Sequence, residues 1–350
     1  MRSHYEPVMS QASAPSRTIA GWWRDAVWRS DPGLMRTIAL AAVVANVCIV
    51  ESGGAVRLSQ SGLGCPTWPR CTANSLVPAP DAGIHTVNML IEFGNRVFTI
   101  LVFVVAMLCV WVAARLSPRR RSLMAIALLL PLGVLVQAVL GGITVLTALN
   151  PGLVAAHFGV SMGLIAAAVA LYVRSGESDG PVHVFVRPEL RWLARCVVAV
   201  VFLQLAIGTI VTGTGPHAGD ARSPRFPFGI EQVAQLHTDA GWAMVGLTFA
   251  LLFALHITGA QARLVRRTTE LFALELAQGV VGYVQYFLGV PAPLVAVHIL
   301  AAALVWVAAL RMLFAARERL PGRGLSQWGL VPTEIALHGG EQDRPLATDL

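Results

Sequence analysis

The chain has 350 residues, of which 55% are hydrophobic and only 13% are charged, and its mean hydropathy is +0.65. A soluble domain usually carries about 25% charged residues, so this composition excludes an ordinary soluble protein. The formal net charge of +7 comes from arginine without any lysine. The arginines lie between apolar runs rather than on one soluble surface, which argues against a nucleic-acid-binding module.

Apolar runs long enough to cross a bilayer, about 20 residues each, recur along the whole chain. In chain order we expect transmembrane helices at residues 34–52, 92–114, 123–147, 152–173, 193–213, 233–257, 270–289 and 293–314. These runs are far longer than barrel strands and lack alternation of polar and apolar residues, so helices are the expected spanning form. The expected fold class is an all-α integral membrane protein with eight transmembrane helices.

Polar segments flank the spans at both ends of the chain. Residues 1–33 are expected to form a cytoplasmic N-terminal arm, too long and polar for an ordinary signal peptide. Within this arm, Gly21 to Arg29 is expected to be a short helix lying on the inner membrane interface. Residues 320–350 are polar, and we expect a disordered cytoplasmic tail there. The two halves between these segments cover residues 34–175 and 190–316.

The arginines predict the orientation of the helices in the membrane. Most of them fall in alternate connections between spans or beyond the last span: Arg115, Arg119, Arg120, Arg121, Arg174, Arg187, Arg191, Arg195, Arg263, Arg266, Arg267, Arg311, Arg317 and Arg319. By the positive-inside rule these connections face the cytoplasm. We therefore expect both termini in the cytoplasm and an even number of spans.

An internal repeat divides the chain into two halves. Residues 137–157 (QAVLGGITVLTALNPGLVAAH) and 278–298 (QGVVGYVQYFLGVPAPLVAVH) share Gln, Val, Gly, the triplet Leu-Val-Ala and the final His at identical spacing. The opening glutamines correspond, and so do His157 and His298. Gln and His are rare inside spans, which makes chance similarity a poor explanation. The repeat predicts two pseudo-symmetric four-helix bundles related by an axis along the membrane normal.

Four polar residues occupy equivalent places in this repeat. With the predicted orientation, the second, fourth, sixth and eighth spans all run from outside to inside. Asn95, His157, His237 and His298 each lie about one helical turn into these spans. At 1.5 Å per residue, this places them about 6–8 Å below the outer end. Polar groups within spans are costly and usually functional.

Three histidines at one depth favour haem ligation. Neutral imidazole is a usual nitrogen ligand of haem iron, and two histidines on facing helices can hold a haem between them. His237 and His298 form such a pair in the second half. The first half offers His157 and Asn95, and an amide is a poor iron ligand. The ordinary alternative is that each histidine makes only an interhelical hydrogen bond, which explains a lone histidine better than three at equivalent depth.

Glu92 and Arg96 are four residues apart and therefore share one face of their helix. The ordinary interpretation is an interfacial ion pair that closes the helix end. Alternatively, Glu92 exchanges protons with a substrate beside the incomplete ligand pair at Asn95, since carboxylates partly removed from water commonly serve as acid–base groups. We favour the second interpretation.

Cys65 and Cys71 lie six residues apart in the first outer loop, in the sequence CPTWPRC. Prolines restrict this loop, and no companion pair of cysteines is present. On the oxidising side of a membrane, these features favour a disulfide over a metal site. The spacing leaves open whether the bond only staples the loop or also cycles in redox.

Three segments resemble the haem A synthases. They are Glu51–Pro69 (ESGGAVRLSQSGLGCPTWP), Glu92–Arg96 and Gly213–Asp220, and the resemblance extends over about residues 35 to 315. It implies an oxidoreductase that oxidises a ring methyl group of haem O to the formyl group of haem A. Hydroxylated intermediates, oxygen derived from water and a bound b-type haem as electron carrier are implied as well.

The resemblance also implies roles for particular residues. These are Glu92 for the chemistry; His157, Asn95 and Arg96 for the site of the substrate haem; His237 and His298 as ligands of the b-type haem cofactor; and Cys65 and Cys71 for the loop disulfide.

Asn95 departs from the family pattern, which commonly has histidine at this position. The substrate iron would then be five-coordinate with His157 as its ligand, or receive His85 from the loop above, or Asn95 would act by hydrogen bonding. The asymmetry suits a permanent cofactor in one half and a substrate that enters and leaves in the other.

Two other classes of protein fit part of the sequence. A cytochrome b-like protein that carries electrons from quinol explains His237 and His298. It does not explain Glu92 beside a site that has only one histidine ligand. A transporter suits a repeated bundle, but transporters place polar groups near the midplane. We expect a multi-pass protein of a bacterial plasma membrane. Its candidate partners are haem O, haem O synthase, a quinone or other electron acceptor, membrane lipid and further copies of the chain, with no nucleic acid.

Overall fold

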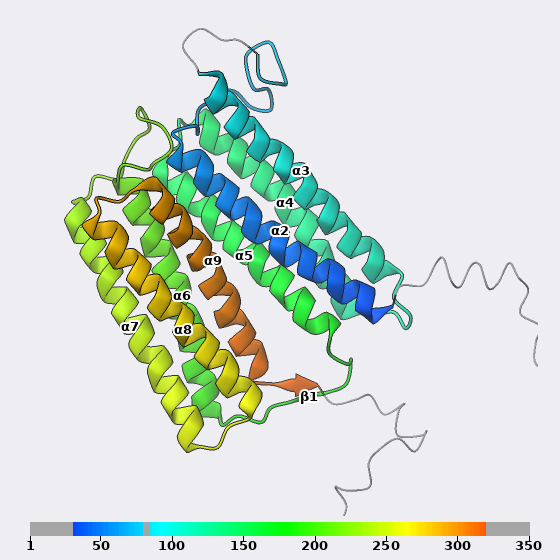
Figure 1. Ribbon diagram of the computed structural model, residues 1–350. Coiled ribbons are helices and arrows are strands. Elements are labelled where there is room, and N and C mark those ends of the chain that lie inside the picture. The colour runs from blue at the N-terminus through cyan, green and yellow to red at the C-terminus, as the bar shows by residue number, and fades with distance from the viewer. Residues whose placement is uncertain (1–30, 80–84, 320–350) are drawn as a thin grey trace, which may run out of the picture.

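The computed structural model describes residues 31–79 and 85–319 and is mostly helical (Figure 1). Its elements are α2 (Pro32–Leu58), α3 (Thr86–Ala114), α4 (Arg121–Leu146), α5 (Pro151–Ser175), β1 (Val182–His183), α6 (Pro188–Thr214), α7 (Ile230–Ile257), α8 (Ala262–Phe287), α9 (Ala292–Ala315) and β2 (Glu318–Arg319). The predicted interfacial helix at Gly21–Arg29 and the predicted tail at 320–350 lie outside the described residues.

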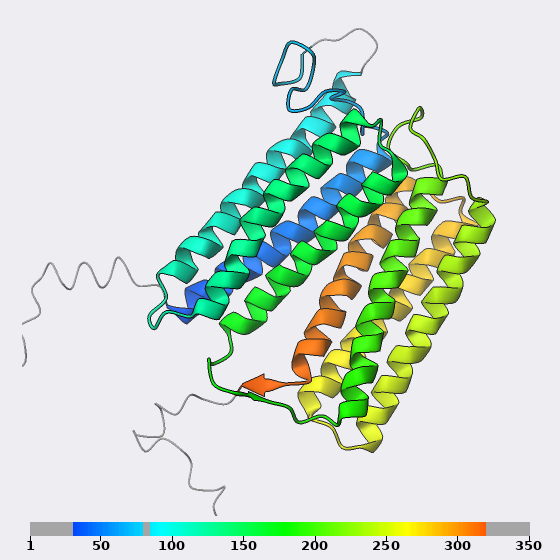
Figure 2. The same ribbon diagram turned by 180° about the vertical axis from the view of Figure 1, so that it is seen from behind.

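The helices form two groups of four that stand side by side (Figures 1 and 2). In the first group α3 contacts α2 and α4, and α5 contacts the same two helices, which closes a ring. Helices α6 to α9 form a second ring in the same manner. The rings meet where α2 and α5 pack against α9, and where α5 also packs against α6.

Seven of the eight described helices are long and apolar enough to cross a membrane. The exception is α8, which carries Arg263, Arg266, Arg267 and Glu270 in its first half and Glu275, Gln278 and Gln285 in its second half. Its apolar part begins at about residue 270, as predicted, and the remaining helix extends eight residues further back. The predicted all-helical fold is confirmed, whereas the eighth crossing stays a prediction.

Local sequence determines where several helices begin. Asp31 and Asn150 accept hydrogen bonds from backbone N–H groups in the first turns of α2 and α5, and each is followed by proline at the first helical position. Helix α3 begins at Thr86, six residues before the predicted span. Hydropathy marks where a helix leaves the bilayer, not where its backbone hydrogen bonding ends, so the helices extend beyond the apolar runs.

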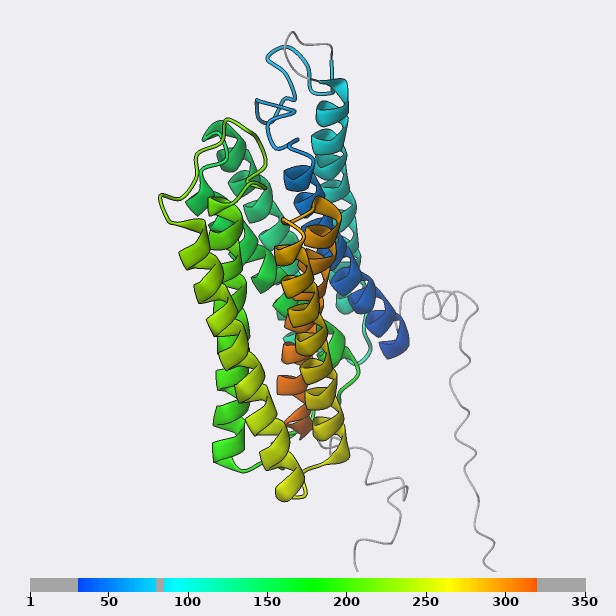
Figure 3. The ribbon, with the colours of Figure 1, turned by 60° about the vertical axis from the view of Figure 1, so that its left-hand side comes forward.

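The four polar residues lie six to nine residues after the starts of their helices. His157 and His298 follow the starts of α5 and α9 by six residues, His237 follows the start of α7 by seven, and Asn95 follows the start of α3 by nine. These offsets are about 9–14 Å at 1.5 Å per residue. Because the helices extend beyond the apolar runs, these offsets do not measure depth within the spans, and the depth of about one turn stays a prediction. The loop after α2 carries the Cys65–Cys71 disulfide and stands above the helices at one end of the molecule (Figure 3). We call this end the disulfide end.

Trp306 of α9 joins the two rings in the middle of the molecule. Its indole Nε1 donates to the backbone carbonyl of Met162 in α5 at 2.9 Å. Its ring centre lies 5.7 Å from that of Phe202 in α6. Because the side chain is 6% exposed and its polar atom is paired, Trp306 can be buried at this three-helix junction without an unsatisfied donor.

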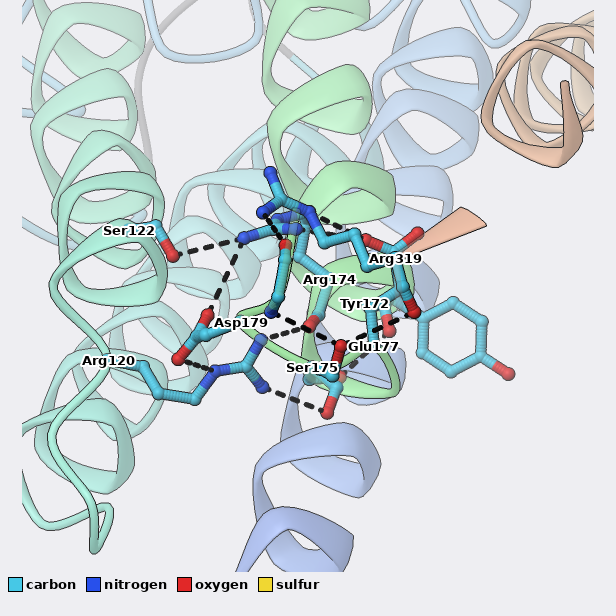
Figure 4. A network of polar contacts seen from close by, with 10 residues as sticks. Arg120, Ser122, Tyr172, Arg174, Ser175, Glu177, Asp179 and Arg319 are labelled. Carbon is cyan, nitrogen blue, oxygen red and sulfur yellow. Dashed lines mark hydrogen bonds and ion pairs between the residues drawn. The ribbon is translucent and has the colours of Figure 1, made fainter. Parts of the chain in front are cut away.

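A buried ionic network ties the two halves together at the opposite end (Figure 4). Arg174 in the last turn of α5 is 5% exposed and pairs with Glu177 at 3.0 Å. It also donates to the Ser122 hydroxyl of α4 at 3.1 Å. Arg319 approaches Glu177 at 3.6 Å, and its strand β2 pairs antiparallel with β1. The chain after α9 is thus held to the connection between α5 and α6.

We expect Arg174→Met to lower the free energy of unfolding by about 3–5 kcal/mol, because it leaves the Glu177 carboxylate buried without its closest partner. The double variant Arg174→Met/Glu177→Leu should recover much of this loss. Chemical denaturation of the detergent-solubilised protein measures both. Arg266→Met is the control, since that guanidinium side chain is 67% exposed, and an equal loss in the control would contradict the prediction.

Candidate functional site

His237 of α7 and His298 of α9 face each other across the second ring of helices. Their ring centres are 6.3 Å apart, and the ring planes are inclined by 64°. An imidazole nitrogen lies about 2.0 Å from a bound metal and about 1.2 Å from its own ring centre, so two rings on opposite sides of one metal have centres about 6.4 Å apart. The separation therefore fits a haem iron held between two histidines. Within residues 31–79 and 85–319, no three His, Cys, Asp or Glu side chains gather as a metal site, but a porphyrin supplies the other ligands itself.

A glutamine in the preceding helix holds the backbone of each of the three histidines. Its side-chain Nε2 donates to the backbone carbonyl oxygen of the histidine at 2.9–3.0 Å in the pairs Gln137–His157, Gln204–His237 and Gln278–His298. The correspondence between Gln137 and Gln278 predicted from the sequence is thus matched by one shared contact. The same contact from Gln204 was not predicted.

A glycine four residues after each glutamine makes room for the histidine ring. A β-carbon built on these glycines would lie 3.2–3.4 Å from Cε1 of the ring, in the pairs Gly141–His157, Gly208–His237 and Gly282–His298. Each imidazole therefore rests against bare helix backbone. The pattern Gln-x-x-x-Gly occurs at these three places as QAVLG, QLAIG and QGVVG, but also as QSGLG at residues 60–64 and QYFLG at residues 285–289, so the pattern alone would not have singled out Gln204.

Two polar atoms stay unsatisfied at each of these places. Among the residues that the structure describes, Nδ1 of each histidine and Oε1 of each supporting glutamine are buried without a hydrogen-bond partner. Buried polar atoms are normally paired. Nδ1 of each ring lies 3.8–4.0 Å from the β-carbon built on the supporting glycine, so it faces the neighbouring helix, and Nε2 is the ring nitrogen that points away from that helix.

The fourth equivalent place, at Asn95, is built differently. Ile49 stands four residues before Gly53, where the other three places have glutamine. The Ser52 hydroxyl donates to Oδ1 of Asn95, and a β-carbon built on Gly53 would meet nothing within 4 Å. The space that a histidine ring fills at the other places is therefore open beside Asn95. His85 is exposed at the start of α3, ten residues or about 15 Å along the helix from Asn95, so it does not complete the pair.

Glu92 and Arg96 form the predicted ion pair and also fasten the disulfide loop. The Glu92 carboxylate is 5% exposed, and its Oε1 accepts from Arg96 at 2.6 Å. Its Oε2 accepts from the backbone N–H of Cys65 at 2.7 Å. Arg96 donates further to the backbone carbonyls of Cys65 at 2.9 Å, Thr67 at 3.1 Å and Arg70 at 3.1 Å. The pair therefore attaches the loop to α3, in addition to closing the helix end.

The predicted disulfide is present. Cys65 and Cys71 are bonded, and neither residue is exposed to solvent. The loop that they close carries Trp68, whose indole lies against Gly142 of α4. Gly142 directly follows Gly141, on which the ring of His157 rests. The sequence did not predict that this loop reaches the first site.

A cavity of about 340 Å³ lies between α5 and α6, where the two rings meet. Its lining is almost wholly apolar and includes Phe158, Met162, Phe202 and Ala206. At 100° per residue, His157 lies about 150° around α5 from the centre of this lining. The cavity is therefore separate from the histidine sites.

Comparison with known proteins identifies the family. Residues 36–310 match the sequence profile of the COX15-CtaA family, which is described as cytochrome oxidase assembly protein. The heme A synthase of Lysinibacillus sphaericus (strain C3-41) is 29% identical over 225 residues, which are 62% of this chain and 70% of that protein.

Two further relatives match shorter segments. The heme A synthase of Listeria welshimeri is 30% identical over 150 residues, 41% of this chain and 47% of its own length. That of Halalkalibacterium halodurans is 28% identical over 140 residues, 39% of this chain and 45% of its own length. The match to this chain thus spans less than half of these two relatives. The profile match nevertheless covers most of this multi-pass helical chain, which therefore belongs to the cytochrome oxidase assembly family that includes the haem A synthases.

Proposed function

We propose that this protein is a haem A synthase, an oxidoreductase that oxidises a ring methyl group of haem O to the formyl group of haem A. The proposal rests on the difference between the candidate haem ligands of the two halves. One half has two histidine rings 6.3 Å apart, whereas the repeat gives the other half His157 and Asn95 at the equivalent positions. A permanent electron carrier benefits from two firm ligands, while a substrate must bind and leave. The relatives named heme A synthase support the same activity.

The second half would hold a b-type haem between His237 and His298. When bound, this group supplies one-electron transfer. Gln204 and Gln278 position the two histidines through their backbone carbonyls, and the glycines beside the rings let the imidazoles lie close to the neighbouring helices. Supporting contacts of this kind orient metal ligands and strengthen binding.

The first half would receive haem O, with His157 as ligand of the substrate iron. Asn95 would act by hydrogen bonding, since its side chain already contacts Ser52. Conversion of a methyl group to a formyl group takes one oxygen atom from water and releases four electrons and four protons. The four electrons would need an acceptor in the membrane, for which a quinone is our candidate.

Glu92 is the proposed proton acceptor of this reaction. It lies three residues before Asn95 and therefore on a neighbouring part of the same helix face. Arg96 stays in contact with the carboxylate at 2.6 Å and would balance its charge. Because Oε2 holds the disulfide loop directly and Oε1 holds Arg96, which also bonds the loop, a test has to separate proton transfer from loop attachment.

We further propose the arrangement of the protein in the membrane. The two rings of helices would be related by a pseudo-twofold axis, with α8 as the eighth span. The repeated contacts of glutamine, glycine and histidine support this relation. The disulfide end would face outward from a bacterial plasma membrane, with both termini in the cytoplasm. Haem O synthase, lipid and further copies of the chain are proposed partners.

Extraction of pigments after co-expression with a haem O source tests the proposed function. We expect haem A or its hydroxylated precursor in the wild-type protein. Glu92→Gln should abolish both, because the neutral amide cannot accept the proton, while haem B stays bound. Haem B alone in the wild type would favour the alternative function, an electron carrier of the cytochrome b type.

Arg96→Lys is the matched variant for the loop. This variant keeps the Glu92 carboxylate but removes the Arg96 guanidinium group, which donates hydrogen bonds to three loop carbonyls. We expect this variant to retain haem A formation in part. If both variants lose the product to the same extent, Glu92 serves to attach the loop, and its role as proton acceptor is wrong.

A further inference from the structure

A loop residue covers one position of α4 in the first ring of helices. Trp68 lies against Gly142, and a β-carbon built on this glycine would be 2.5 Å from the indole. No side chain larger than hydrogen fits at position 142 without displacing Trp68. The indole thus occupies the place beside α4 that a side chain of the helix itself would otherwise fill.

The equivalent place in the second ring is closed by helix residues. The repeat aligns Gly142 with Tyr283 of α8. The Tyr283 hydroxyl accepts a hydrogen bond from the indole Nε1 of Trp242 in α7 at 3.0 Å. Here α7 and α8 are joined directly by their own side chains. Between α3 and α4, the corresponding positions are Ile100 and Gly142, which cannot form such a bond.

We propose that a membrane-dissolved metalloporphyrin reaches the first site between α3 and α4, and that the indole of Trp68 is the movable closure of this route. The proposal rests on the proposed function, since it concerns access of the haem substrate to His157. The location supports it, because Gly142 follows Gly141, on which the His157 ring rests, and the two positions point about 100° apart around α4. Trp68 and His157 therefore lie against adjoining faces of α4 at nearly the same height, and displacement of the indole uncovers the face next to the ligand.

The contacts of the loop allow the side chain to move alone. Arg96 holds the carbonyls of Thr67 and Arg70 on either side of Trp68, and Glu92 holds the N–H of Cys65. The Trp68 indole donates to no residue within the described ranges 31–79 and 85–319 and is 39% exposed. It can rotate away from Gly142 while the loop backbone stays attached, whereas the hydrogen-bonded pair of Trp242 and Tyr283 keeps the second ring closed around a permanent group.

Exchange kinetics of ferric protoporphyrin IX test the proposal with the full-length purified protein. The first-site fraction is the bound pigment that His157→Ala loses. We expect Trp68→Ala to raise the dissociation rate of this fraction, measured by transfer to excess apomyoglobin, by about tenfold or more, as expected when apolar contact of a large side chain is removed. Gly142→Ala should raise the rate as well, because its methyl group would lie 2.5 Å from the indole and displaces Trp68.

The controls separate this route from general damage. Trp242→Ala should leave the first-site rate unchanged, and an unchanged spectrum of the second-site pigment shows that each variant is folded. Trp68→Phe should raise the rate less than Trp68→Ala. Rates equal to the wild type in both Trp68→Ala and Gly142→Ala would overturn the proposed route and leave the proposed function standing. Absence of any His157-dependent binding in the wild type would overturn both.

Discussion

Replacement of His298 by alanine is expected to remove the bound b-type haem from the purified protein. The variant loses one of two rings whose separation fits an iron between them. Loss of a contact that merely supports a metal ligand weakens binding by about 10–100-fold, so loss of the ligand itself should weaken it by at least about 100-fold. Absorbance of the reduced protein and extracted haem B per chain measure the result.

Two further variants make this test specific. His256→Ala should leave the spectrum unchanged, since His256 is exposed and bonds only the backbone of Leu252 at the other end of α7. Gly282→Leu should weaken binding like His298→Ala, because a β-carbon there already approaches the His298 ring to 3.2 Å. Full haem content in His298→Ala would show that the pair does not ligate the cofactor.

Asn95→His is expected to convert the first site into a six-coordinate haem site. The new ring has room, because nothing lies within 4 Å of a β-carbon built on Gly53, and it would face the same bundle interior as His157. A second nitrogen ligand should change the first-site haem from high-spin to low-spin and raise its affinity by about tenfold or more. Electron paramagnetic resonance and titration with ferric protoporphyrin IX detect the change.

The double variant Asn95→His/Gly53→Leu is the matched control. The leucine occupies the open space above Gly53, so the introduced ring cannot rest against α2, and the gain in affinity should disappear. A high-spin first-site haem in the single variant, with unchanged affinity, would contradict the equivalence of Asn95 with the three histidines.

Several features of the protein were predictable from local patterns. Hydropathy located all eight described helices, since a span requires a continuous apolar run. The repeat identified the corresponding glutamines and histidines of the two halves, because polar residues inside spans stand out from an apolar background. Cysteine spacing was enough to predict the disulfide. Helix starts were predicted less closely, since helical hydrogen bonding continues past the apolar runs.

The sequence by itself thus determined the helical membrane fold, the family and the three histidines, because each is expressed in composition or short-range spacing. Only the tertiary structure decided that Glu92 holds Cys65, that Trp68 closes the place beside Gly142, and that Arg174 ties the connection between the halves to other parts of the chain. These contacts join residues separated by 27, 74 and 52 positions. Helical periodicity relates only near neighbours in the chain, whereas these partners are brought together by packing of helices and loops, which no local pattern records.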